Sequence, residues 1–494
     1  MDRVGFDNEA YISKQSEHIM TRIAAFDRLY LEYGGKLFDD FHAARVLPGF
    51  QPDSKMKMLL TLADQVEVVV VINANDIERS KRRTDIGVTY DQEVMRMIDA
   101  FREHGLHCGS VCVCRYEGQA RALSFMARMN ALGVPVYLHY PIEGYPANLQ
   151  HVLSDAGFGR NHYIETSRPL IVVTAPGPGS GKMATCLSQL YHEHKKGIHS
   201  GYAKFETFPI WNLPLKHHVN LAYEAATVDL MDVNMIDPFH WEAYGVIAVN
   251  YNRDVETFPI LSAMFERLFG HSPYKSPTDM GVNMAGYCIV DDEVCRQASE
   301  QEVLRRYYRT QFDVMVGRTD AGAMNRMELL ISQLGIRPEL RAVVTPALAK
   351  QAMTGNPAAA IQLTDGRVVT GKTSDLLGAS SAALLNSLKV LAGIDDAELL
   401  IPPSVIEPIQ ELKVGHLGNR NPRLHMDETL IALAISADKS QNAQLAVKQL
   451  HNLKGCEAHS TVVLSPVDSE VYRKLGIHLT VEPTYESNRL FRRE

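Results

Sequence analysis

The sequence predicts an α/β fold with a mainly parallel sheet, and three observations support this. Between residues 66 and 173, short apolar runs alternate with segments of helical periodicity, as in successive βα units. The run VEVVVVIN at 66–73 is apolar almost throughout, as in a strand covered on both faces. A glycine-rich turn joins the apolar run LIVVT at 170–174 directly to a helical segment. Together these features indicate a Rossmann-like arrangement.

The first part of the chain is expected to alternate between helices and strands. The stretch 8–33 has amphipathic helical spacing and stops at two glycines, so it predicts a helix that docks on the sheet. Apolar positions at 94, 97, 98 and 101 place one stripe on a second helix, which Gly105 can end. The remaining elements expected in this part are strands at 66–73, 110–114, 135–139 and 170–174 and a helix at 119–132.

We predict three domains. Residues 1–225 form the Rossmann-like domain with the glycine-rich turn, and residues 226–335 form a mainly helical domain. Residues 336–494 form a C-terminal α/β domain, in which AAIQL, a turn at Asp365 and Gly366, and RVVTG predict a hairpin.

Composition excludes several classes of protein. The chain has 494 residues, 46% of them hydrophobic, and a formal charge of −8, so we expect no attraction to nucleic acid or to anionic membranes. Its seven cysteines are sparse and odd in number, which favours a reducing compartment. The N-terminus shows no secretory signal, and no apolar run approaches a membrane span. We therefore expect a cytoplasmic protein. We further expect it to be a homo-oligomer and to bind a small-molecule anionic ligand.

The most specific motif is APGPGSGKMAT at 175–185. A glycine-rich turn from strand to helix directs successive backbone N–H groups and the positive end of the helix dipole toward one point, which makes an anion site. The motif approximates the P-loop pattern GxxxxGK[ST], and it matches that pattern at its last glycine and lysine. The residues predicted to hold the anion are Gly177, Gly179, Ser180, Gly181 and Lys182.

Two departures from the P-loop pattern matter physically. Pro176 and Pro178 lack an N–H, so two potential donors are missing. Met183 stands where a P-loop has the hydroxyl that ligates Mg²⁺. Three interpretations stay open: binding of a phosphate-bearing molecule through backbone donors and Lys182, a purely structural turn, and ordinary Mg²⁺-dependent hydrolysis of a nucleoside triphosphate. The first is favoured, and the last is the least favoured.

Basic residues follow the ends of neighbouring predicted strands. Open α/β sheets bind ligands at their carboxyl edge, so Arg79, Arg82 and Arg115 could assist the anion site. The alternative is that the run ERSKRR is a solvated loop, as most charged runs are.

Other clusters carry weaker signals. Cys112 and Cys114 project to the same face of a predicted strand, which we interpret as core packing, and we predict no metal site. Polar loops at 275–283, 370–375 and 419–428 could each complete a cleft, although such loops are more often turns and helix caps.

Four stretches resemble a family of uncharacterised bacterial proteins of about this length. They are FHAARVLPGF, TAPGPGSGKMATCLSQLYHE, FETFPIWNLPL and HMDETLIALAIS. The resemblance covers essentially the whole chain and implies a cytoplasmic multidomain α/β architecture, with no catalytic residue to transfer. Some relatives carry the label ATP-dependent peptidase, but this sequence has neither a peptidase constellation nor a complete nucleotide motif.

Two hypotheses of function follow. The leading one is an enzyme that binds a phosphorylated or nucleotide-like small molecule at 175–185. The alternative is a non-catalytic oligomeric scaffold or regulatory protein in which the Gly-Pro turn is structural.

Overall fold

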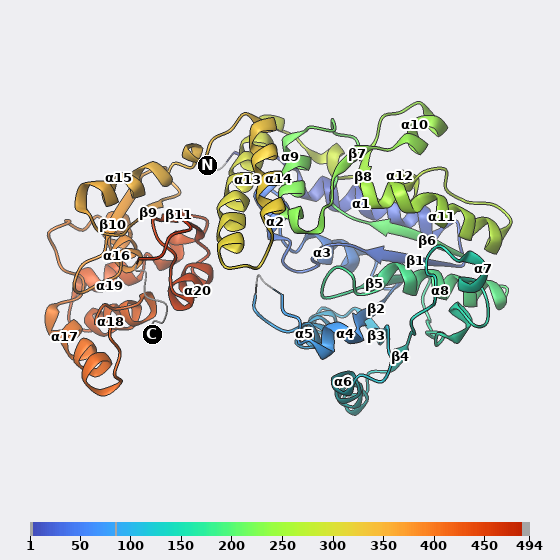
Figure 1. Ribbon diagram of the computed structural model, residues 1–494, viewed down its shortest axis with the longest axis horizontal. Coiled ribbons are helices and arrows are strands. Elements are labelled where there is room, and N and C mark those ends of the chain that lie inside the picture. The colour runs from blue at the N-terminus through green and yellow to red at the C-terminus, as the bar shows by residue number, and fades with distance from the viewer. Residues whose placement is uncertain (1–2, 84–85, 487–494) are drawn as a thin grey trace. The chain divides into compact units, whose positions relative to one another are not determined.

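The computed structural model describes residues 3–83 and 86–486 and divides the chain into two compact units, residues 1–299 and 300–494. Each unit has its own sheet (Figure 1). Among the described residues, no helix is both long and apolar enough to cross a bilayer.

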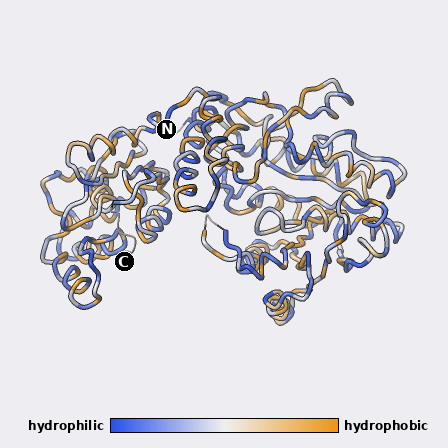
Figure 2. The backbone as a smooth tube through the Cα atoms, in the orientation of Figure 1, coloured by the Kyte–Doolittle hydropathy of each residue, from blue (hydrophilic) through white to orange (hydrophobic). Residues whose placement is uncertain are grey.

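The first unit is built on a six-stranded, all-parallel sheet, which confirms the predicted α/β class. The strand order is β4-β3-β2-β5-β1-β6. The strands are β1 Arg28–Tyr33, β2 Val66–Asn73, β3 His107–Cys114, β4 Val136–Leu138, β5 Leu170–Thr174 and β6 Ser200–Phe205. All eight residues of β2 are buried, in line with its apolar sequence, and the apolar strands can be followed in Figure 2.

Helices cover both faces of this sheet. A core cluster joins one face to α8 and α11, while α5 packs on β2 and β3, and α1 on β1. The helices of the first unit are α1 Asn8–Ile23, α2 Phe41–Val46, α3 Ser54–Thr61, α4 Ala74–Glu78, α5 Tyr90–Glu103, α6 Ala120–Ala131, α7 Leu149–Val152, α8 Lys182–Lys195, α9 His218–Ala226, α10 Pro238–Tyr244, α11 Asn252–Phe269 and α12 Pro277–Met280. A short antiparallel pair, β7 Asn234–Ile236 and β8 Val249–Tyr251, lies among the later helices.

One predicted element was wrong. The stretch 8–33 is not a single helix: α1 ends at Ile23 and β1 occupies 28–33, between β5 and β6. The charged residues of β1 concealed it, because Glu32 is buried in this strand and accepts a hydrogen bond from Tyr202 Oη at 2.7 Å. A polar residue satisfied by a partner from the neighbouring strand breaks the apolar run that marks a parallel strand.

The chain reverses its direction of travel across the sheet between β2 and β5. After β2 it proceeds to β3 and β4 on one side, whereas after β5 it proceeds to β6 on the other. Right-handed crossovers therefore send the following helices to opposite faces. The carboxyl ends of β2 and β5 thus flank a topological switch point, where open α/β sheets bind ligands.

The second unit contains a mixed sheet in the order β10-β9-β11-β12. The predicted hairpin is confirmed as β9 Ala358–Gln362 and β10 Val368–Lys372, and β11 Glu457–Ser460 pairs with both β9 and β12 His478–Val481. The remaining helices are α13 Asp292–Met315, which begins before residue 300, α14 Ala321–Leu334, α15 Val344–Thr354, α16 Ala379–Ala392, α17 Pro403–Glu411, α18 Met426–Ala437, α19 Gln441–Val447 and α20 Pro466–Lys474. The apolar faces of α16 to α20 share one core with the sheet, whereas Ala347 of α15 packs with Ala360 of β9 in a separate cluster.

Candidate functional site

The glycine-rich turn lies at the switch point. It leaves β5 at Thr174 and enters α8 at Lys182, as the sequence predicted for a strand-to-helix turn. Gly179 and Gly181 have φ angles of +75° and +103°, in the left-handed region that favours glycine. The backbone therefore bends sharply just before the first turn of α8.

Close packing beneath the turn explains two of its glycines. A Cβ added to Gly177 would lie 2.1 Å from Tyr90 Oη, and one added to Gly181 would lie 2.9 Å from Cys114 Sγ. On the remaining side, Asn73 Nδ2 donates to the carbonyl of Gly179 at 3.4 Å. The turn is thus seated against α5 and the ends of β2 and β3.

The outer side of the turn is open. Pro178 and Gly179 are exposed, whereas Ser180 is buried and its Oγ donates to the carbonyl of Gly177 at 2.8 Å. Gly181 caps α8 without a side-chain hydrogen bond. Within residues 3–83 and 86–486, no acceptor is recorded for the N–H groups of Gly177 or of residues 179–183. The donors that an anion would need are therefore unoccupied.

The first side chains of α8 have different surroundings. Lys182 is half-buried. Burial raises the pKa of Cys186 and of Glu206, and the positive charge of Lys182 opposes both shifts. Met183 packs against the core cluster. Thr185 is fully buried, with its Oγ1 3.3 Å from Cys114 Sγ. Neither Met183 nor Thr185 supplies a hydroxyl on the open side of the turn for Mg²⁺.

The three predicted arginines lie on loops that follow β2 and β3, whose carboxyl ends are paired neighbours. Arg79 ends α4 and is exposed. Arg82 is exposed and donates to the carbonyl of Gly87 at 2.8 Å, so its guanidinium is partly engaged in its own loop. Arg115 directly follows β3 with a φ of +53°, a strained conformation that tends to occur at functional sites.

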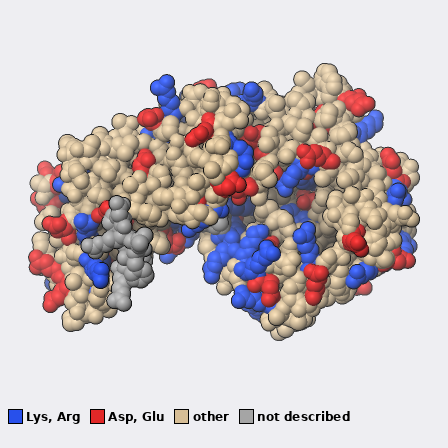
Figure 3. Space-filling model, in the orientation of Figure 1, with Lys and Arg blue, Asp and Glu red and all other residues tan. Residues whose placement is uncertain are grey.

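Figure 3 shows Lys and Arg side chains gathered over the region of α4 and α5. The described part of the chain records no hydrogen bond from the three arginines to the glycine-rich turn. Their assistance to the anion site stays a prediction.

Two hydroxyl groups near the turn have no partner in the described structure. Thr174 Oγ1, at the end of β5, and Tyr145 Oη are both buried without a hydrogen bond. Burial raises the pKa of Tyr145, and the positive charge of Arg115 opposes that shift.

Sequence reasoning missed a cluster of charged side chains at the carboxyl end of β6. Lys204 Nζ donates to both carboxylate oxygens of Asp254, at 2.7 and 2.6 Å, and lies 3.3 Å from Glu206 Oε1. Burial raises the pKa of Glu206 to about 7, with Lys204 opposing the shift and Asp254 adding to it. The same carboxylates raise the pKa of Lys204. Glu206 can therefore exchange a proton near neutral pH.

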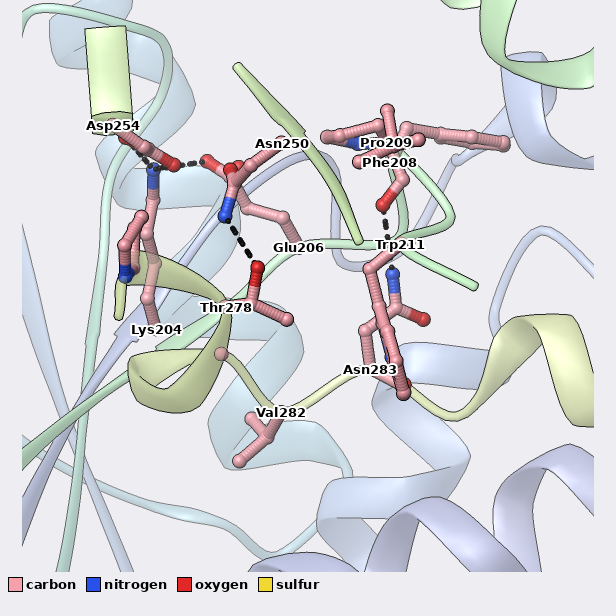
Figure 4. Close-up of a pocket in the computed structure, with 13 residues that line it drawn as sticks. Lys204, Glu206, Phe208, Pro209, Trp211, Asn250, Asp254, Thr278, Val282 and Asn283 are labelled. Carbon is pink, nitrogen blue, oxygen red and sulfur yellow. Dashed lines mark hydrogen bonds and ion pairs between the residues drawn. The ribbon is translucent and has the colours of Figure 1, made fainter. Parts of the chain in front are cut away.

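Glu206 and Lys204 line a cavity of about 50 Å³ (Figure 4). Thr278 and Asn283 complete its polar lining, so the predicted polar loop at 275–283 contributes to this cavity. The signal that could have revealed it was SGYAKFE at 200–206, in which Lys204 and Glu206 stand two residues apart and so share one side of an extended segment.

The turn and this cavity belong to one edge of the sheet. Only β1 separates β5 from β6, and strands are spaced by about 4.8 Å, so the two strand ends lie roughly 10 Å apart. Lys182 at the turn and Glu32 on β1 both contribute to the electrostatic environment of Glu206. One elongated ligand could reach both features.

The second unit contains its own polar cavity. The predicted loops at 370–375 and 419–428 both contribute to its lining, through Thr373, Arg423 and His425. These groups largely satisfy one another: Arg423 Nη1 pairs with Glu486 at 2.6 Å, and His425 Nδ1 lies 3.3 Å from Asp468.

Comparison with known proteins covers both units. The family model described as "Domain of unknown function DUF1846, N-terminal" matches residues 4–335, and its C-terminal counterpart matches residues 339–491. The chain is 56% identical over 494 residues to the UPF0371 protein stu1377 of Streptococcus thermophilus and 55% identical to the UPF0371 protein of Streptococcus sanguinis, each alignment covering all of both chains. The chain therefore belongs to the DUF1846 family, whose bacterial relatives carry the name UPF0371 protein.

Proposed function

We propose that the protein is an enzyme that binds a phosphorylated or nucleotide-like small molecule at the glycine-rich turn. The observation that carries this proposal is the set of N–H groups at Gly177 and residues 179–183 that have no acceptor among the described residues, on a turn exposed at Pro178 and Gly179. Backbone donors at the start of a 14-residue helix attract an anion, and Lys182 adds a full positive charge beside them.

The anion lies at one end of the proposed ligand, and the chemistry takes place toward β6. A nucleotide or sugar phosphate is long enough to cover the roughly 10 Å between the ends of β5 and β6. Glu206 acts there as the proton donor or acceptor, because a carboxyl group with a pKa of about 7 exists in both forms at neutral pH. Since Met183 replaces the magnesium-ligating hydroxyl, binding is independent of Mg²⁺. Cytoplasmic location and a homo-oligomeric state stay predictions.

Equilibrium titration tests the proposal. The wild-type protein is titrated with ATP, ADP, a sugar phosphate and inorganic phosphate, each with and without Mg²⁺. We expect at least one to bind, with similar affinity in both conditions. Loss of one charge-assisted contact in Lys182→Ala weakens binding by roughly ten- to a hundredfold.

A matched control lies on the same helix. Lys195 is exposed at the far end of α8, about 20 Å from Lys182, where it pairs with Asp155, so Lys195→Ala leaves affinity unchanged. Equal affinities of wild type and Lys182→Ala, or no binding of any compound, would refute the proposal and favour the structural role of the turn.

A further inference from the structure

Three ligand-bearing side chains converge beneath the glycine-rich turn. Cys112 and Cys114 share one face of β3, and His139 directly follows β4. The pairing of Val113 with Leu138 brings the ends of these two strands together. All three residues are buried, and their ligand atoms lie within 4.8 Å of one another.

The distances suit a tetrahedral metal ion. Cys112 Sγ and Cys114 Sγ are 3.9 Å apart. Two sulfur atoms bound at about 2.3 Å to a tetrahedral zinc ion are separated by about 3.8 Å. The sulfurs therefore need almost no movement to share one ion.

The imidazole of His139 is oriented as a metal ligand. Its Nε2 lies 3.1 Å from the carbonyl oxygen of His162, so this nitrogen donates its proton there. The lone pair then belongs to Nδ1, which makes Nδ1 the coordinating atom. Histidine ligands of metals are usually held in this way, by a hydrogen bond from the other ring nitrogen.

A fourth group faces the same space from α8. Thr185 Oγ1 lies 3.3 Å from Cys114 Sγ and 4.0 Å from Cys112 Sγ. The hydroxyl of Thr185 therefore lies beside both sulfur atoms, on the side of the cluster that faces α8.

We propose that Cys112, Cys114 and His139 bind one zinc ion, with Thr185 on its fourth side. Thiolate and imidazole ligands in tetrahedral arrangement select this thiophilic cation over Mg²⁺ or Ca²⁺. Two thiolates neutralise the charge of the ion, which a buried site requires. The position of the ion, next to Gly181 and Thr185, indicates a structural role in fixing the corner where β3 meets α8.

This proposal reverses the interpretation of Cys112 and Cys114 as core packing alone. The third ligand comes from a neighbouring strand, and nothing in the spacing of the cysteines reveals it. The site is independent of the proposed function, because it needs no ligand at the turn.

Metal loading of the full-length protein tests the site. The reduced protein is incubated with Zn²⁺ or Co²⁺, freed of excess metal, and analysed for bound metal and for its absorption spectrum. We expect one ion per chain, with the sulfur-to-cobalt charge-transfer band and the intense visible bands of tetrahedral Co²⁺. Absence of stoichiometric metal, or a cobalt spectrum without the sulfur band, would overturn the proposal.

Variants locate the site. Cys114→Ser and His139→Gln abolish stoichiometric binding and the sulfur band or reduce them strongly. Cys108→Ser, at a buried cysteine of the same strand outside the cluster, retains both. If Cys114→Ser fails to fold, His139→Gln and the wild-type cobalt spectrum still decide the question. Full retention of metal and sulfur band in His139→Gln and Cys114→Ser would place the ion elsewhere.

Discussion

The start of α8 in the first unit and the starts of α18 and α20 in the second unit present their backbone N–H groups differently. Gly181 caps α8 without a side chain, and the amides around it have no recorded acceptor in the described residues. In the second unit, Ser465 Oγ accepts from the N–H of Asp468 at 3.1 Å, and Asp468 Oδ1 accepts from the N–H of Met426 at 2.7 Å.

The difference lies between helix starts whose N–H groups bond to side chains and one whose N–H groups have no partner among the described residues. A side-chain cap stabilises a helix by about 1 kcal/mol, and it occupies the donors that an anion would use. Gly181 at the N-cap of α8 supplies no such side chain, so these donors have no side-chain cap.

Replacing Gly181 should damage the fold at the turn. In Gly181→Ala, the new Cβ meets Cys114 Sγ at 2.9 Å on a backbone with a φ of +103°. Overpacking and backbone strain together should lower the free energy of unfolding by about 2–4 kcal/mol, measured by urea denaturation.

Gly179→Ala is the matched control. Gly179 also has a positive φ, but nothing lies within 4 Å of its added Cβ, so this variant should lose only about 1–2 kcal/mol. Equal losses at both positions would show that the packing of Gly181 on Cys114 has no energetic consequence.

Removing the ionisable group of Glu206 should change how stability depends on pH. Since its pKa rises from 4.5 to about 7 on folding, the folded state keeps a proton that the unfolded state has released between these values. The ionisation of Glu206 therefore lowers the free energy of unfolding as pH rises from about 4.5 to 7, by up to about 3 kcal/mol.

Glu206→Gln cannot ionise and should lack this loss. We expect its free energy of unfolding, relative to wild type, to increase between pH 5 and pH 8, with Glu256→Gln at an exposed position of α11 as control. Parallel pH profiles for wild type and Glu206→Gln would show that Glu206 ionises normally.

The capped helix starts should respond in the ordinary way. Ser465→Ala removes the side-chain acceptor for the N–H of Asp468 and should cost about 1 kcal/mol in thermal or urea unfolding. Ser469→Ala, one turn later on α20, replaces serine by a better helix former and should cost nothing. A loss at Ser469 as large as that at Ser465 would contradict the assigned cap.

A smaller effect concerns His425. Hydrogen bonding to Asp468 raises the pKa of His425 above its ordinary 6.5. The pair therefore stabilises the second unit fully below pH 6.5 and loses that contribution as pH rises through the folded pKa. His425→Gln should cost more at pH 6 than at pH 8.5, by less than about 1 kcal/mol. A cost independent of pH would contradict the pair.

The sequence predicted strands with long apolar runs, such as β2 and β5, and missed β1 and β6, in which polar or small residues break up the apolar pattern. β1 contains Glu32, whose Oε2 accepts a hydrogen bond from Tyr202 of β6. β6 contains Gly201, where the ring of Phe26 fills the place of a side chain, 2.4 Å from an added Cβ. Both features are properties of the assembled sheet, so local patterns could not reveal them.

In the candidate site too, local features could be predicted from the sequence, and features that depend on the folded chain could not. The glycine-rich turn is a local feature, and its position between strand and helix could be predicted from spacing alone. Glu206 depends on β6, and on burial beside Lys204 and Asp254, which come together only in three dimensions. Likewise, His139 joins the two cysteines through the pairing of β3 with β4.

The most direct test of the central claim is a crystal structure of the protein grown with ADP. We expect a phosphate group within hydrogen-bond distance of the N–H groups of residues 179–183 and close to Lys182, with the remainder of the molecule extending along the sheet edge toward Glu206. Ordered ADP bound elsewhere, with only water at the turn, would contradict the claim that these unoccupied amides form an anion site.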